Sequence, residues 1–494
     1  MGLTDRQRRA ALDHGTSKCV TAGAGTGKTH VLVRKYIDLL ESGESGVAGI
    51  LALTFTEKAA QQMLERVRDA AAGKIGPGWD AIRDDLLSAN ISTFHAFCAR
   101  VLREFPLEAG IEPGFSVLDE REAARIREAA ADDLIHGELP GACLDALACT
   151  LRAVGAYELK RYLIRLYEKR AATEEFFSAL KRDEMAVLAA WQEILMQRRE
   201  EAVQNFLSAA RREIAVLADS AARYTGEADP AMIYLRAVEP HLPLLASRRS
   251  DEEVCRAVAA LAEINADRRF TAGMGRKANW DGRDIDAVRE AYRTLNALTK
   301  PCAVTLGLSV DPGDAFTRVT LDFLHSLGVV FSAFSEAVDA AKAKRGALDF
   351  LDLILCTRRL FRDRSDIVDA HFRSRFGFIL VDEFQDTDPA QAAIITAILG
   401  GSPAEGGKLF VVGDPKQSIY LFRDADVTQF KRTRDAIEES LGGEEVRLDV
   451  NFRSTPETVG FVNYVFAGLM AGSARPWEFE YEPLRASRTG DAGT

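Results

Sequence analysis

Long hydrophobic runs and closely spaced cysteines are both missing from this sequence. No uninterrupted apolar stretch approaches the ~20 residues that a membrane-spanning helix needs. The charged N-terminus is not followed by the apolar core of a secretory signal. The seven cysteines lie far apart and form no Cys-x-x-Cys pair, which argues against a metal cage or a redox centre. We therefore expect a protein of the reducing cytoplasm that has no membrane partner.

An excess of positive charge is missing as well. The formal net charge of −11 argues against a protein that coats DNA through bulk charge. It is compatible with a narrow groove that holds a single strand by stacking and by a few phosphate contacts. The composition, 47% hydrophobic and 28% charged, is typical of a globular protein. The 494 residues are enough for roughly three domains of ~150 residues each.

Strand and helix patterns alternate over the first hundred residues. Short apolar stretches predict buried strands at residues 17–22, 49–56 and 91–94, and helical periodicity follows each of them. This βαβ rhythm is typical of a parallel sheet. From about residue 117 to about residue 340 the pattern is almost entirely helical, and its charge runs are interpreted as solvated helix faces.

Strand patterns return in the last third of the chain. They lie at residues 376–383, 408–414 and 445–450, and each is apolar and followed by polar or turn residues, as in buried parallel strands. The sequence therefore predicts an α/β protein in which a helical domain is inserted into the sheet domain. The tail, residues 482–494, lacks core character, and we expect it to be frayed.

A glycine-rich stretch, "AGAGTGKT", follows the first predicted strand and precedes a helix. Its backbone N–H groups and the helix N-terminus suit phosphate oxygens. Lys28 would reach the β- and γ-phosphates, and the Thr29 hydroxyl would bind Mg²⁺. The predicted nucleotide contacts from this stretch are Ala22, Gly23, Ala24, Gly25, Thr26, Gly27, Lys28, Thr29 and His30. Ala22 stands where the general pattern has its first glycine.

Two carboxylates follow the predicted strand in "FILVDEFQDTD". Ligands bind at the carboxyl ends of parallel strands. We assign Asp382 to Mg²⁺ and Glu383 to the general base that polarises the attacking water. Adjacent side chains of an extended strand point to opposite faces, so the two carboxylates cannot both bind the metal while the chain is extended.

Three further stretches combine polar groups with aromatic rings. In "VVGDPKQSIYLFRDAD", the Gln417 amide could sense the γ-phosphate, and Tyr420 and Phe422, with Arg423 next to them, could stack on bases. "TFTEKAA" and "STFHAF" suit phosphate contacts and base stacking. The candidates in them are Thr54, Phe55, Thr93 and His95.

Each of these interpretations has a structural alternative. Tyr420 and Phe422 could both be core residues. Thr56 could cap a helix, and Phe55, Phe94 and Phe97 could simply pack in the interior. In "LDVNFRST", Arg453 could bind the γ-phosphate from a second domain, or it could be a surface arginine.

Eight stretches together resemble the superfamily 1 DNA helicases of the UvrD/Rep type, especially the larger RecB/AddA branch. They occur in the matching order: "LTDRQRRA", "AGAGTGKT", "LTFTEKAA", "STFHAF", "ALDFLDLI", "VDEFQDTD", "VVGDPKQSIYLFRDAD" and "LDVNFRST". The resemblance implies a RecA-like P-loop NTPase sheet with a large inserted helical domain and the start of a second RecA-like domain. The implied domains are residues 1–105 with 341–448, the insertion 106–340, and the truncated second domain 449–494.

The resemblance also implies roles for single residues. Gln7 should read the adenine edge, and Gln417 and Arg453 should contact the γ-phosphate. The implied lining of the single-strand path includes Phe55, His95, Tyr420 and Phe422. This sequence departs from the pattern at His30, where many relatives have arginine, and at Phe452, which replaces a frequent tyrosine.

The implied function is an ATP- and Mg²⁺-dependent DNA helicase or translocase that moves 3′ to 5′ on single-stranded DNA. Its expected partners are single strands, single-strand/duplex junctions and a second helicase–nuclease subunit, in repair or recombination. The chain stops about forty residues past Arg453, so we expect a truncated second domain and no nuclease domain. The alternative is a nucleotide-switched DNA-binding or scaffold module without turnover. A small-molecule P-loop kinase would explain neither the Gln417 stretch nor the Arg453 stretch.

Overall fold

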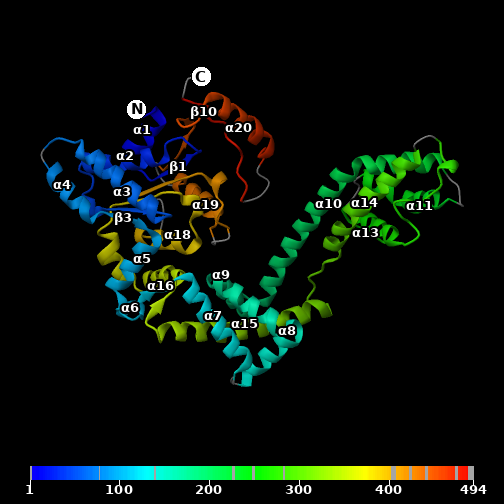
Figure 1. Cartoon of the computed structure of the whole chain (residues 1–494), viewed down its shortest axis with the longest axis horizontal. Coiled ribbons are helices and arrows are strands. Elements are labelled where there is room, and N and C mark those ends of the chain that lie inside the picture. The colour runs from blue at the N-terminus through cyan, green and yellow to red at the C-terminus, as the bar shows by residue number, and fades with distance from the viewer. Residues whose placement is uncertain are drawn as a thin grey trace. The chain divides into compact units, whose positions relative to one another are not determined.

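The computed structural model describes ten stretches of the chain. They are residues 3–76, 78–137, 141–224, 229–247, 251–281, 284–401, 408–421, 425–439, 443–472 and 477–487. The chain divides into two compact units (Figure 1). The first consists of Met1–His136 with Phe334–Thr494, and the second of Gly137–Ala333.

A six-stranded sheet in the order β3-β2-β6-β7-β1-β8 forms the centre of the first unit, and all of its pairs are parallel. Its strands are β1 (Lys18–Ala22), β2 (Ile50–Thr54), β3 (Asn90–Thr93), β6 (Phe378–Val381), β7 (Leu409–Gly413) and β8 (Glu444–Leu448). The central strands are apolar and buried on both faces, as parallel sheets require. The predicted α/β fold class and its strands are therefore confirmed.

Successive residues of each strand enter two different cores, because side chains alternate across a sheet. Cys19 lies in one cluster and its neighbour Val20 in the other, and the same alternation separates Val381 from Leu380. One face is covered by α1 (Asp5–Leu12), α2 (Lys28–Glu41), α3 (Glu57–Ala72) and α4 (Trp79–Asp85). The other is covered by α5 (Phe94–Glu104), α6 (Pro106–Ala109), α16 (Phe350–Asp363), α17 (Ser365–Ile367), α18 (Pro389–Leu399) and α19 (Val427–Glu438).

Several of these helices begin at a capped N-terminus, and the cap fixes the residue at which the helix starts. Thr4 and Gln7 form a capping box on α1. The Thr56 hydroxyl accepts a hydrogen bond from the Ala59 backbone N–H at 3.1 Å, so the capping alternative for Thr56 is correct. The stretch near residue 347 forms β5 (Ala347–Leu348), which lies outside the six-stranded sheet and leads into α16.

A buried ion cluster ties the end of α15 (Ala315–Ala343) to the start of α16. Lys342 Nζ lies 2.6 Å from Asp352 Oδ2 and 3.2 Å from Asp349 Oδ2. Asp349 also caps α16 in a capping box with Asp352. Next to it, β4 (Ser116–Val117) pairs in parallel with β5, and α7 (Glu120–His136) follows β4.

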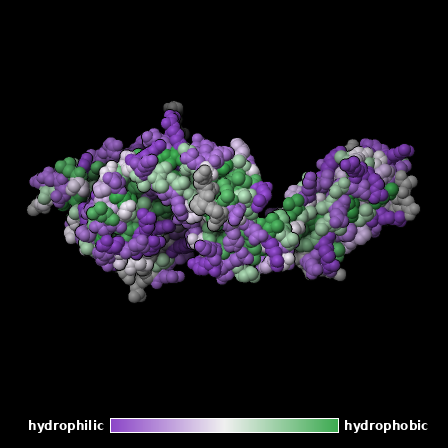
Figure 2. Space-filling model, turned by 90° about the horizontal axis from the view of Figure 1, so that it is seen from below, coloured by the Kyte–Doolittle hydropathy of each residue, from purple (hydrophilic) through white to green (hydrophobic). Residues whose placement is uncertain are grey.

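The second unit is built from helices. They are α8 (Gly141–Glu168), α9 (Arg170–Arg182), α10 (Glu184–Arg223), α11 (Pro230–Val238), α12 (Leu242–Ser247), α13 (Asp251–Ala266), α14 (Asp284–Gly307) and most of α15. The 40-residue α10 runs beside α14 (Figure 1), and both contribute to the larger apolar cluster of this unit. The charge runs lie on exposed faces, as predicted, and hydrophilic residues cover much of the face shown in Figure 2.

One described helix, α15, is long and apolar enough by composition to cross a membrane. Core helices of soluble proteins have the same composition, and Val330, Phe334 and Val338 of α15 are buried in the protein. The absence of a membrane partner stays a prediction, as do the domain boundaries at residues 105, 340 and 448.

The chain after β8 continues through β9 (Val450–Asn451) and α20 (Pro456–Leu469) to β10 (Arg485–Ala486). β10 pairs in parallel with β9, and Asn463 on α20 hydrogen-bonds to the backbone of Leu484. The expectation of a frayed tail is therefore wrong for residues 484–487, because backbone pairing rather than side-chain burial orders this segment. Residues 488–494 lie outside the described residues.

Candidate nucleotide-binding site

The glycine-rich loop joins the carboxyl end of β1 to the N-terminus of α2. Gly25 (φ 75°) and Gly27 (φ 88°) adopt left-handed conformations that side chains disfavour. The Thr26 hydroxyl donates to the Gly23 carbonyl at 2.8 Å and closes the turn. Gly27 caps α2 without a side-chain hydrogen bond, so the first N–H groups of the helix remain available to an anion.

Lys28 and Glu383 meet across the carboxyl edge of the sheet. Lys28 Nζ lies 2.8 Å from Glu383 Oε2, and the Lys28 side chain is only 13% exposed. Glu383 has φ 50°, the one positive φ outside glycine among the described residues. β6 ends at Val381, so the side-chain alternation used to separate Asp382 from Glu383 does not apply to this pair. Strained backbone of this kind clusters at functional sites.

Asp382 is buried beside this pair. Burial, followed by the negative charge of Glu383, raises the pKa of the Asp382 carboxyl to about 6, and Lys28 opposes the shift. Burial and Glu383 also raise the pKa of Asp386 to about 6. Asp386 Oδ1 is buried and has no hydrogen-bond partner within the described part of the chain.

These carboxylates fit a magnesium ion that is shared with a nucleotide. The described residues contain no group of three or more His, Cys, Asp or Glu side chains placed to hold a metal by themselves. Mg²⁺ in nucleotide sites takes one or two protein oxygens and completes its shell with phosphates and water. Asp382 and the hydroxyl of Thr29 supply oxygens of the required type, and a cation would offset both the burial of the Asp382 carboxyl and the negative charge of Glu383 beside it.

Gln385 connects the candidate base to the Gln417 segment. Its Nε2 donates to Glu383 Oε2 at 2.9 Å, and its Oε1 accepts the backbone N–H of Asp414 at 2.9 Å. Asp414 Oδ2 in turn accepts a hydrogen bond from Gln417 Nε2 at 2.6 Å. Gln385 and Asp414 therefore form a hydrogen-bonded chain that links Glu383 to Gln417.

The segment that carries Arg453 lies directly against the loop. Phe452 donates its backbone N–H to the Gly25 carbonyl at 2.9 Å. A Cβ added at Gly25 would lie 2.9 Å from the Arg453 Cβ. The Arg453 side chain is exposed and, within the described residues, forms no ion pair. A guanidinium at this place is close enough to the loop to serve a bound phosphate chain.

The remaining predicted nucleotide contacts differ in accessibility. Gln7 is buried, and its Nε2 donates to the Thr26 carbonyl at 3.1 Å. Ala22 is fully buried at the end of β1. His30 lies near the surface of the protein. Its pKa is lowered by partial burial of the ring and by nearby positive charges, which include Arg34. Their nucleotide contacts stay predictions.

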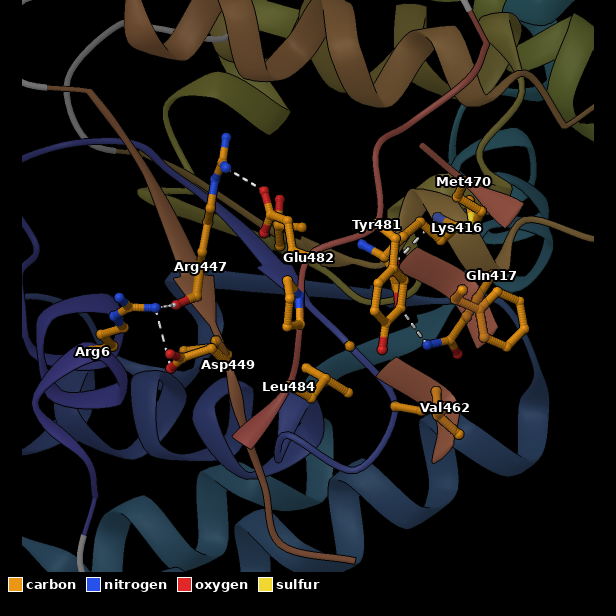
Figure 3. A pocket seen from close by; sticks show the side chains of 17 residues that line it. Arg6, Lys416, Gln417, Arg447, Asp449, Val462, Met470, Tyr481, Glu482 and Leu484 are labelled. Atoms are coloured by element: carbon orange, nitrogen blue, oxygen red, sulfur yellow. Dashed lines mark hydrogen bonds and ion pairs between the residues drawn. The ribbon is translucent and has the colours of Figure 1, made fainter. Parts of the chain in front are cut away.

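A cavity of about 440 Å³ opens beside the loop (Figure 3). Gln417 and Lys416 border the cavity on one side, and Leu484 borders it on another. A Cβ added at Gly23 would lie 3.0 Å from the Leu484 side chain. Arg6 donates to the Arg447 carbonyl at its rim. The cavity therefore joins the loop, the Gln417 segment and the tail.

The predicted DNA contacts fall into three groups. Phe55 and Tyr420 pack against each other with their ring centroids 4.6 Å apart and their planes tilted by 34°, and both residues are partly exposed. The hydroxyls of Thr54 and Thr93 are buried and hydrogen-bonded to Thr56 O and Glu57 Oε1. His95 is partly exposed and packs against the Phe350 ring at 5.6 Å.

Two further predicted contacts, Phe422 and Arg423, lie outside the described residues. The packing alternative is correct for Phe94 and Phe97, which are 4% and 1% exposed. For Phe55 and Tyr420 the structure brings together two partly exposed rings from distant motifs. Their contact with DNA stays a prediction.

The loop, the facing carboxylates and the parallel sheet place the chain in the class of RecA-like P-loop proteins. The chain belongs to the UvrD/REP helicase N-terminal domain family, whose model matches residues 3–234 and 325–438. The resemblance seen in the sequence is thereby confirmed.

The similar proteins share one name, which designates the A subunit of an ATP-dependent helicase/nuclease. The protein from Moorella thermoacetica is 30% identical over 99% of this chain and 36% of its own length. That from Geobacillus kaustophilus is 30% identical over 94% and 39%. That from Listeria monocytogenes is 26% identical over 94% and 39%. This chain thus spans less than two fifths of the length of these relatives.

Sequence reasoning did not identify Gln385 and Asp414, which link Glu383 to Gln417 by hydrogen bonds. Both stand inside stretches that carry predicted site residues, "VDEFQDTD" and "VVGDPKQ", but no local pattern tells which amide faces which carboxylate. The sequence signal was only that polar residues follow two neighbouring strands.

Proposed function

We propose that this chain forms the ATP-hydrolysing motor of a DNA helicase or translocase that acts in repair or recombination. The Lys28–Glu383 pair at the loop, with Arg453 against the same loop, is the observation that carries the proposal. The printed name of the relatives, which describes an ATP-dependent helicase/nuclease, supports it.

The residues would act in a defined order. Phosphate oxygens draw Lys28 away from Glu383, which frees the Glu383 carboxylate to accept a proton from the attacking water. Thr29 and Asp382 would hold Mg²⁺, which supplies charge neutralisation on the phosphates when it is bound. Gln417 and Arg453 then contact the terminal phosphate, and both contacts are lost once that phosphate leaves.

The DNA contact would be coupled to this cycle through one short segment. Gln417 and Tyr420 are three residues apart, and the Tyr420 ring packs against Phe55, which directly follows β2. A shift of Gln417 therefore moves a ring that can stack on a base. We propose movement along single-stranded DNA with 3′-to-5′ polarity.

The relatives' names, which describe one subunit of an enzyme, motivate a further proposal about partners. The chain acts with a second helicase–nuclease subunit on single strands and single-strand/duplex junctions. It does so in the cytoplasm, in keeping with its scattered cysteines.

The test is ATP hydrolysis by the 494-residue chain, with and without oligo(dT), beside the Lys28→Ala variant. We expect oligo(dT) to stimulate the wild-type rate and the variant to show no hydrolysis above background. Hydrolysis that survives Lys28→Ala would overturn the assignment of the site. Binding of ATP and oligo(dT) without any turnover would favour a nucleotide-switched DNA-binding module instead. Polarity is read from whether displacement of a bound protein requires a 3′ or a 5′ single-stranded tail.

A further inference from the structure

Asn451 is a buried polar residue to which the nucleotide chemistry above gives no role. It lies at the end of β9 and is 4% exposed. Its Nδ2 donates to the Ala24 carbonyl at 2.7 Å. Its Oδ1 accepts the backbone N–H groups of Arg453 at 2.9 Å and Ser454 at 2.7 Å. One carboxamide thus joins the phosphate-binding loop to the backbone that carries Arg453.

Gly25 shows how closely the two segments approach. A Cβ at Gly25 would lie 2.8 Å from Asn451 Nδ2, a distance that real Cβ atoms essentially never show. The Gly25 carbonyl also accepts the Phe452 N–H at 2.9 Å. Two consecutive loop carbonyls, those of Ala24 and Gly25, are therefore held by two consecutive residues of the opposite segment.

The direction of these hydrogen bonds matters for phosphate binding. A phosphate chain uses the N–H groups of such a loop, whereas Asn451 and Phe452 use its carbonyls. Phosphate and Asn451 therefore do not compete, and the link to Arg453 can persist while a nucleotide is bound. β10 reinforces the arrangement, because Ser487 donates its N–H to the Asn451 carbonyl at 2.8 Å.

We propose that Asn451 is a positioning residue for Arg453 and thereby sets the preference of the site for triphosphate over diphosphate. The inference rests on the proposed function, because it requires Arg453 to meet the terminal phosphate. By fixing the backbone of Arg453 to the loop, Asn451 limits the positions from which the guanidinium can reach that phosphate. A pre-organised donor loses less entropy on binding than a mobile one.

The test is a double-mutant cycle on nucleotide preference. Calorimetry in the presence of Mg²⁺ would measure the affinities of adenylyl imidodiphosphate, a non-hydrolysable triphosphate, and of ADP for the 494-residue chain. Arg453→Ala should lower the triphosphate-to-diphosphate preference roughly 10- to 100-fold, the range for a lost charge-assisted hydrogen bond. Asn451→Ala should lower it to a similar degree, and the double variant should be no worse than Arg453→Ala within about twofold, since the two residues act as one unit.

A matched control separates positioning from general loss of structure. Asn90→Ala also removes a buried carboxamide that donates to a backbone carbonyl, that of Ala48, but on β3 at the far edge of the sheet. It should leave the preference unchanged. If Asn451→Ala does not fold, Asn451→Ser replaces it, because a serine hydroxyl can still accept a backbone N–H of the turn but is too short to reach Ala24.

The outcomes distinguish the inference from the proposed function. Loss of preference in Arg453→Ala with wild-type preference in the Asn451 variants overturns the inference alone. Additive losses in the double variant overturn it as well. A wild-type chain that binds no triphosphate, or an Arg453→Ala variant that keeps the preference, refutes the proposed site and the inference with it.

Discussion

Lys28 Nζ and Glu383 Oε2 lie 2.8 Å apart at the carboxyl edge of the sheet. The group expected to bind phosphate and the group expected to activate water thus neutralise each other until a phosphate chain enters between them. Burial, followed by the negative charge of Glu383, raises the pKa of the neighbouring Asp382 carboxyl, and Lys28 opposes only part of this shift. The site is prepared for a ligand that brings both negative charge and a divalent cation.

Glu383→Gln should abolish turnover and preserve binding. The variant frees Lys28 for phosphate but removes the proton acceptor, so we expect the hydrolysis rate to fall by about 10²–10⁴, the usual contribution of a general base. ATP affinity should be equal to or tighter than that of the wild type. Single-turnover hydrolysis and equilibrium binding measure the two effects separately.

Glu444→Gln is the control for that variant. Glu444 also pairs with a lysine, Lys18 at 3.0 Å, but at the start of β8 and away from the loop. Its turnover should match that of the wild type. A Glu383→Gln variant that still hydrolyses ATP would show that another group activates the water.

Tyr420→Ala should weaken binding of single-stranded DNA. The neighbouring rings of Tyr420 and Phe55 form one aromatic platform, and stacking of a base on such rings contributes about 1–3 kcal/mol per base. We expect the dissociation constant for oligo(dT), measured by fluorescence anisotropy at fixed salt, to rise roughly tenfold. Tyr464→Ala, which removes an 84% exposed ring from α20, should leave it unchanged. Equal affinities of the wild type and Tyr420→Ala for oligo(dT) would show that this platform does not contact DNA.

Lys342→Met should loosen the junction between α15 and α16. It removes the lysine that pairs with the buried carboxylates of Asp349 and Asp352, and breaking a buried pair in this way costs about 3–5 kcal/mol. Hydrogen exchange at the amides of α16 would record the loss as reduced protection. Asp339→Asn removes the 60% exposed partner of the same lysine and should change protection by less than about 1 kcal/mol. Similar exchange in both variants would refute the importance of the buried pairs.

The buried lysine of α2, Lys35, should make stability rise with pH above neutrality. Burial lowers its pKa to about 8, while Asp13 and Asp38 act in the opposite direction. Between that pH and the unfolded value near ~10.4, the unfolded chain binds the proton more tightly than the folded one. The free energy of unfolding therefore increases across this window and is lower, and constant, below it.

From pH 7.5 to 9.5 the wild type should gain about 2 kcal/mol relative to Lys35→Met, as expected for a folded pKa near 8. Urea denaturation followed by circular dichroism at both pH values gives the difference. Lys74→Met, which alters a partly exposed lysine paired with Glu41, should retain the wild-type pH dependence. If the free energies of unfolding of the wild type and of Lys35→Met changed equally with pH, the lowered pKa of Lys35 in the folded protein would be contradicted.

The sequence was sufficient for features that depend on local pattern or on the common edge of parallel strands. The loop at Gly23–Gly27 is one contiguous stretch, and Lys28 meets Glu383 because β1 and β6 both end at that edge. Long-range details escaped it. The positive φ of Glu383, the Gln385 bridge and the link from Asn451 to Ala24 depend on the register between segments that no local periodicity encodes.

The same limit explains the error at the chain's end. Residues 484–487 carry little apolar surface, so composition indicated fraying. Their order comes from backbone pairing of β10 with β9 and from the Leu484 contact at Gly23, and both are long-range contacts that composition does not report.

Equilibrium binding of MgATP to the 494-residue chain and to Lys28→Ala tests the central claim, that the loop at Lys28 is the nucleotide site, most directly. Calorimetry should show one site per chain in the wild type. Loss of a charge-assisted contact to two phosphates should weaken binding in Lys28→Ala by roughly 100-fold or more. Equal affinity in the two proteins would contradict the assignment of the nucleotide site to this loop.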